Sequence, residues 1–219
     1  MSRKMAFILA IIGVIQFIIL ISIAMGFYAG GNEFNPDAPG YSFWLNSISD
    51  LGRTVAWSGK SNIISQILLC ISMILWGLSF VPSMHALSSF FSESRRGKLL
   101  TEIGLIFAFL CVFLLVFDVV LFPVDTQPQL HAIFAASSYL SLLIVEILYS
   151  ITMFLDMNYP KKHAICFLAL AVVIVIYFIL NNPISQKLIS ITITIATLIV
   201  FYDAWKMQKR KNNQGVMKI

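Results

Sequence analysis

Long apolar segments alternate with short polar ones along the whole chain. A helix needs about eighteen or more mostly apolar residues to cross a bilayer. Segments that meet this length are predicted at 5–28, 60–87, 99–122, 130–155, 163–180 and 184–205. The short alternating stretches typical of a transmembrane β-barrel do not dominate anywhere. The pattern predicts an all-α polytopic membrane protein, with residues 1–219 forming one membrane domain built as a six-transmembrane-helix bundle.

The longest polar segment, residues 29–59, separates the first two apolar segments. It begins with GGNEFNPDAPG, in which turn-forming residues cluster. In the YSFWLNSISDLGRT that follows, Trp44, Ile48 and Leu51 recur at the spacing of one helix face. This predicts a short interfacial helix, with Trp44 at the level of the lipid headgroups and Gly52 as a residue that can end it.

Composition excludes a soluble domain and gives the chain a direction. Hydrophobic residues make up 59% of the chain and charged residues 11%, against roughly a quarter charged in soluble domains. The net charge of +5 does not indicate nucleic-acid binding, because the basic residues lie in short connections and a tail. Of the fifteen, only Arg53, Lys60 and Lys187 lie on the side of the 29–59 loop. The positive-inside rule therefore predicts a protein of the cell membrane with both termini cytoplasmic, an extracytoplasmic 29–59 loop and a frayed cytoplasmic tail at 206–219.

The first apolar segment has a rival interpretation as a cleaved signal peptide. Its apolar core, from Met5 to Tyr28, is longer than the roughly 7–15 apolar residues of a signal sequence. We therefore expect a retained transmembrane helix.

Candidate chemistry is concentrated in DVVLFPVDTQPQLH, residues 118–131. Asp118 lies within a predicted spanning helix, where an acid is costly and indicates function. Asp125 lies in the following turn, and His131 opens the next helix. A carboxylate beside an imidazole can orient a general base or supply metal ligands. Asp118, Asp125 and His131 are thus the candidate catalytic residues, and the candidate ligands if a metal is bound; for Asp125 and His131, a turn cap and an interfacial anchor are the alternatives.

Further polar residues are expected to reach the same face of the membrane. Ser49, Asp50 and Arg53 are candidates to close the site from above, and Ser138 lies two helical turns below His131. These four are candidate substrate-binding residues. Ser47 or Ser49 with His131 and Asp118 would also resemble a nucleophilic serine arrangement.

Glu146, another candidate substrate-binding residue, lies near mid-depth in the predicted fourth helix, and Gln16 in the first helix has a similar depth. An acid there can relay protons or bind an ion; alternatively it stays neutral and bridges helices. Gln16 is the expected hydrogen-bond partner.

Several common sites are excluded by counting. The three cysteines, each in an apolar segment, form no CxxC motif, and no P-loop, GxSxG or HExxH occurs. Three histidines are too few for the paired ligands of a typical membrane haem. The residues assign no cofactor and no oligomeric state.

Two strings resemble the hallmarks of domain-of-unknown-function family 998: SISDLG at 47–52 and LFPVDTQPQLH at 121–131. The resemblance implies a six-helix membrane protein, loosely related to the Frag/DRAM/Sfk lineage, whose eukaryotic members are linked to lipid-anchor remodelling and membrane trafficking. The family's biochemical activity is unassigned. Matching positions draw attention to Ser49, Asp50, Gly52, Pro123, Asp125 and His131.

Three functions are compatible with these patterns. The first is a lipid-associated protein that binds or modifies a headgroup at the Asp/His site near the extracytoplasmic leaflet, with membrane lipids and no nucleic acid as partners. The second is a small proton-coupled transporter that uses Glu146. The third is a membrane assembly or structural protein without a ligand.

Overall fold

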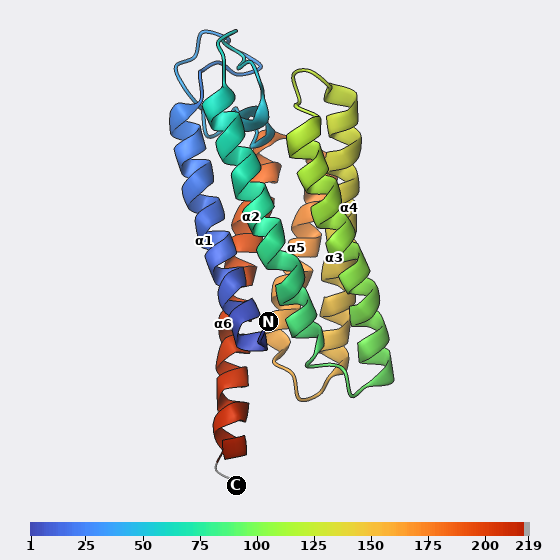
Figure 1. Cartoon of the computed structure of the whole chain (residues 1–219). Coiled ribbons are helices and arrows are strands. Elements are labelled where there is room, and N and C mark those ends of the chain that lie inside the picture. Colours follow the sequence, from blue (N-terminus) through green and yellow to red (C-terminus); the bar gives the residue numbers. More distant parts are fainter. Residues whose placement is uncertain (217–219) are drawn as a thin grey trace.

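Six long helices account for most of the chain (Figure 1). The structure is a computed structural model that describes residues 1–216, with side chains to residue 209. The helices are α1 (Arg3–Phe27), α2 (Ile63–Ser88), α3 (Arg95–Leu121), α4 (Pro128–Leu155), α5 (Lys161–Leu180) and α6 (Pro183–Val216), with a 3-10 turn, η1 (Ser49–Gly52), between α1 and α2. All six are long and apolar enough to cross a membrane. The predicted six-helix membrane bundle is confirmed.

The helices form a closed ring in chain order. Each packs against its neighbours in the sequence, and α6 packs against α1. Consecutive helices run antiparallel, joined by short connections everywhere except between α1 and α2, so the polar segments collect at two ends (Figure 1). Residues 28–62 and the α3–α4 turn lie at one end, which we call the loop end; the N-terminus and the α2–α3 and α4–α5 connections lie at the opposite end (Figure 1).

Two helix boundaries differ from the prediction by four residues or more. α3 begins at Arg95 rather than 99, because the hydroxyl of Ser94 accepts a hydrogen bond from the Gly97 N–H at 3.2 Å and caps the helix. α6 continues past 205 to Val216, where a frayed tail was expected at 206–219. Lysine, arginine and glutamine are good helix formers, so the polar sequence extends the helix. Residues 217–219 lie outside the described part.

The interfacial helix is a single 3-10 turn, Ser49–Gly52, and it ends at the predicted glycine. It is short because side chains within it and just before it bond to nearby backbone, which competes with helix formation. Asn46 Oδ1 accepts from the Ser42 N–H at 2.9 Å, and Asp50 Oδ2 accepts from the Ser47 N–H at 2.9 Å. Trp44 remains 66% exposed.

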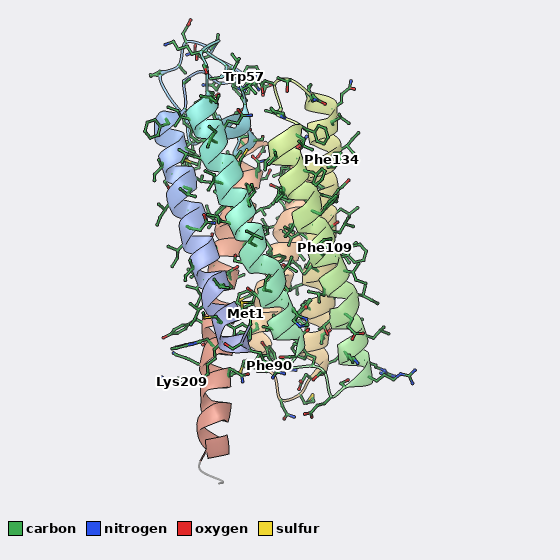
Figure 2. The ribbon with its side chains drawn as sticks, in the orientation of Figure 1. Met1, Trp57, Phe90, Phe109, Phe134 and Lys209 are labelled. Atoms are coloured by element: carbon green, nitrogen blue, oxygen red, sulfur yellow. The ribbon has the colours of Figure 1, made fainter. Side chains whose placement is uncertain are left out.

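Small and polar residues line the contact between α1 and α2. A Cβ on Gly13 would lie 1.9 Å from Ser79 Oγ, so the helices touch backbone to side chain. The amide of Gln16 donates to the Ser72 carbonyl of α2 at 3.1 Å, and not to Glu146 as expected. Large apolar side chains such as Phe109, which is 63% exposed, project outward where lipid would contact them (Figure 2).

Candidate functional site

Residues 28–62, which we call the covering segment, lie over the loop end (Figure 1), and a buried carboxylate organises their fold. Asp50 is 7% exposed, and its Oδ2 accepts hydrogen bonds from Asn46 Nδ2 at 3.2 Å and from the Ser47 N–H at 2.9 Å. Its Oδ1 accepts from the indole N–H of Trp57 at 2.9 Å, and the guanidinium of Arg53 lies 3.7 Å away. Figure 2 shows Trp57 in this covering segment. Both oxygens are therefore used to hold the segment's fold.

Asp125 fastens the α3–α4 turn to that segment. Its carboxylate accepts from the Thr54 N–H at 3.0 Å, the Thr54 hydroxyl at 2.6 Å and the Val55 N–H at 2.9 Å. Burial alone would raise the pKa of Asp125, but these hydrogen bonds outweigh it and hold the pKa below its ordinary value. Asp125 thus stays ionised and connects two polar segments.

Asp118 and His131 form a pair beneath this connection. Oδ1 of Asp118 lies 2.9 Å from Nδ1 of His131, close enough for an ion pair, although the two groups are not aligned as a hydrogen bond and neither atom bonds to another described residue. Asp118 is in the last turn of α3 and is 2% exposed, whereas the His131 side chain is 16% exposed. The predicted approach of these two residues is confirmed. A carboxylate on Nδ1 fixes the ring's orientation and leaves Nε2 free for chemistry.

A cavity of about 510 Å³ adjoins the pair at the loop end. Its polar lining includes Ser49, Asp50, Arg53, His131 and Gln186. A smaller hollow of about 40 Å³ shares Ser49, His131 and Gln186 with the cavity and reaches Asp118 and Tyr139. Ser49, Asp50 and Arg53, which the sequence predicted to close the site from above, therefore line the same cavity as His131.

Ser49 is the hydroxyl of the covering segment that lines both spaces. Its Oγ lies 2.8 Å from Ser47 Oγ. The amide oxygen of Gln186 accepts the Ile48 N–H at 2.8 Å and ties this turn to α6. The guanidinium of Arg53 stacks 4.0 Å from the centre of the Trp57 ring, at the cavity wall.

Three of the predicted site residues, Ser138, Asp125 and Glu146, lie elsewhere. Ser138 is buried, donates to the Ala135 carbonyl at 2.9 Å and lines a separate hollow in the middle of the bundle. Asp125 bonds to Thr54 and Val55 and lines neither the cavity nor the smaller hollow. In the part of the chain with described side chains, no three His, Cys, Asp or Glu residues form a group that could hold a metal. Asp118, Asp125 and His131 are therefore not a three-ligand set, because backbone N–H donors engage the third carboxylate.

Glu146 is buried, at 3% exposed, on α4 between α3 and α5. It forms no hydrogen bond with the described side chains and does not line the loop-end cavity. Cys111 on α3, Tyr149 on α4 and Cys166 on α5 are the titratable groups that face it. The sequence correctly placed a buried acid in the fourth helix, but the expected bond from Gln16 is not formed.

Sequence reasoning missed the residues that secure the covering segment from below. Lys187, 4% exposed and four residues after the start of α6, donates to the carbonyls of Asn46 and Pro183. Asn62 donates to the carbonyls of Leu51 at 3.1 Å and Arg53 at 3.0 Å. The charge pattern uses Lys187 only as a sign of topology, although a lysine just inside an apolar segment is itself a signal of buried acceptors.

Comparison of the chain with protein-family models, with curated proteins and with solved structures finds no match in any of the three.

Proposed function

We propose that the protein is a membrane enzyme that hydrolyses or transfers a lipid headgroup, with His131 as general base and Asp118 as the residue that orients it. The observation that carries this proposal is the 2.9 Å contact between Asp118 Oδ1 and His131 Nδ1 beside a cavity of about 510 Å³. A buried acid is costly within a membrane helix. The pairing of this acid with a histidine that lines a cavity supports a catalytic role for the acid.

The pair supports acid–base chemistry at Nε2 of His131. With Asp118 ionised, Nδ1 carries the proton and Nε2 is the base. It takes a proton from the Ser49 hydroxyl or from a water molecule, which then attacks the ester or phosphoester. Asp118 stabilises the imidazolium that forms, and the imidazolium returns the proton to the departing oxygen. Arg53 at the cavity wall is a suitable partner for a phosphate.

The position of the cavity supports a lipid as the substrate. Asp118 lies in the last turn of α3, so the pair sits about one turn below the end of the apolar bundle. Headgroups occupy this depth of a bilayer. Oxygen-rich headgroups and the ester bonds beneath them would both be within reach of the cavity.

We place the loop end on the extracytoplasmic side of the cell membrane, with both termini cytoplasmic. Twelve of the fifteen lysines and arginines belong to the opposite end or the tail, which supports this orientation under the positive-inside rule. The resemblance to family 998 is part of the same proposal. Its two strings meet here, since Ser49 and His131 line one cavity.

The test uses the full-length protein reconstituted in vesicles of phosphatidylethanolamine, phosphatidylglycerol and phosphatidylcholine. Mass spectrometry follows the release of headgroups and fatty acids. We expect His131→Gln to abolish release and Asp118→Asn to slow it by at least about a hundredfold, because the wrong tautomer is favoured. His85→Gln, an exposed histidine at the opposite end, is the matched control. Ser49→Ala distinguishes a serine nucleophile from water. Release that is unaffected by His131→Gln, or none from the wild type, contradicts the proposal.

A further inference from the structure

Glu146 is a buried acid that the proposed chemistry does not use. It lies nine residues from the C-terminal end of α4, about 14 Å along the helix axis. It is 3% exposed, and no described lysine, arginine or histidine forms an ion pair with it. An ionised carboxylate without a partner is strongly disfavoured in a membrane interior. A bound proton is the simplest ligand that removes this cost.

A series of hollows extends from the loop-end cavity toward this acid. The 510 Å³ cavity and the 40 Å³ hollow share His131. That hollow shares Leu115 and Tyr139 with a third space of about 50 Å³ in the middle of the bundle. Each is large enough for at least one water molecule, which needs about 10–15 Å³.

The third hollow ends next to Glu146. Leu142 lines it and lies one helical turn before Glu146 on the same face of α4. Cys111 also lines it and is close enough to interact electrostatically with the carboxyl. Ser138 and Ser190 supply further hydroxyl groups to this otherwise apolar space. The shared lining residues thus place the three spaces in sequence from the loop end, with the last of them close to the acid.

We propose that Glu146 is a proton-binding site inside the membrane, loaded from the loop end through these hollows. The step is a simple transfer: a hydronium ion that arrives through the hollows gives its proton to the carboxylate and leaves a water molecule. Release reverses the step along the same path. The site depends on Glu146 and the hollows, and it stands whether or not His131 is a catalytic base.

The groups that face Glu146 favour the protonated form. Cys111 from α3, Tyr149 from α4 and Cys166 from α5 are neutral at physiological pH or, if charged, negative. None can neutralise a carboxylate. The Tyr149 hydroxyl already donates to the Met84 carbonyl at 3.0 Å, so it is not free to donate to Glu146.

Infrared difference spectroscopy of the full-length protein in lipid vesicles tests the site directly. The spectrum of the wild type minus that of Glu146→Gln should contain the carbonyl band of a protonated carboxylic acid at neutral pH. On transfer from H₂O to D₂O this band should shift as its proton exchanges. Absence of the band, or a band that does not exchange, overturns the proposal.

The route is tested by filling the hollows. Leu115→Trp places a large ring where two of the hollows meet, and we expect exchange at Glu146 to slow by at least tenfold. Phe113→Trp on the same helix is the matched control, because Phe113 is 43% exposed on the outer face, and exchange should match the wild type. Equal exchange in Leu115→Trp and Phe113→Trp overturns the route. Loss of lipid turnover in His131→Gln with unchanged exchange at Glu146 would separate the two functions.

Discussion

The carboxylate of Asp125 accepts a 2.6 Å hydrogen bond from the hydroxyl of Thr54, a residue 71 positions earlier in the chain. It also accepts the backbone N–H groups of Thr54 and Val55. One side chain therefore holds the α3–α4 turn against the covering segment. His131 follows the same turn and lines the cavity together with residues of the covering segment. Asp125 therefore fixes the position of the covering segment relative to the start of α4.

Asp125→Ala should weaken this connection. The substitution leaves the Thr54 and Val55 donors without their acceptor, and hydrogen bonds to a charged group are worth about 1.5–3 kcal/mol. We expect the free energy of unfolding in detergent to fall by about 2–3 kcal/mol. Asp37→Ala, an exposed acid in the same covering segment, is the control. Equal stability of the two variants would refute the connection.

The same contact predicts a dependence of stability on acid. The folded pKa of Asp125 lies below its ordinary value of 3.8, so the ionised form is favoured in the folded state. Its contribution is complete above pH 3.8 and is lost as the pH falls through the lowered folded value. The difference in unfolding free energy between wild type and Asp125→Asn should therefore shrink in this acid range. A difference that stays constant down to the acid limit of folding would contradict the assignment.

Asp50→Ala should loosen the covering segment and be visible at Trp57. The change removes the acceptor of the Trp57 indole N–H and of the Ser47 N–H. We expect a destabilisation of about 3 kcal/mol, as for a broken buried polar network. A change in Trp57 fluorescence should accompany it, measured in a variant whose other three tryptophans are phenylalanine. Asp50→Asn keeps one acceptor oxygen, so its stability should lie between those of the wild type and Asp50→Ala. If Asp50→Ala leaves the Trp57 fluorescence of the single-tryptophan variant unchanged, the bond between Trp57 and Asp50 is refuted.

The sequence predicted the helices and the Asp118–His131 pair because both depend on local constraints. Apolar length specifies a spanning helix, and a short turn forces α3 and α4 together, which brings residues 118 and 131 into reach. The helix ends were less predictable. Ser94 capping and the polar but helix-favouring end of α6 depend on a balance of small local energies.

The division of roles between Asp118 and Asp125 was not predictable in the same way. Both are acids near one turn, and only the folded covering segment offers donors to Asp125. That segment is held by contacts across long separations, such as the bond from the Ile48 N–H to Gln186. Sequence periodicity carries no record of these contacts.

Tyr28 predicts a loss of stability in alkali. Its ring packs edge-on against Tyr41 at 5.6 Å, and burial raises the pKa of Tyr28 from 10.0 to about 12. The neutral phenol is therefore favoured in the folded state. This contribution is complete below pH 10 and is lost as the pH rises through about 12. The free energy of unfolding, measured by thermal unfolding, should therefore decrease by about 2 kcal/mol more in the wild type than in Tyr28→Phe over this pH range. Parallel curves for the two proteins would rule out the buried phenol.

Close contact between α1 and α2 predicts a compensating pair of substitutions. A Cβ on Gly13 would lie 1.9 Å from Ser79 Oγ and 2.6 Å from Ser79 Cβ, so Gly13→Ala must push the helices apart. Overpacking of this kind costs about 1–3 kcal/mol. Ser79→Gly removes both clashing atoms, and the double variant should recover most of the loss. Gly26→Ala in the same helix, where a Cβ would meet nothing within 4 Å, is the control and should change little. If Gly13→Ala is destabilising but Ser79→Gly gives no recovery, the clash lies elsewhere and the two helices do not meet at these residues.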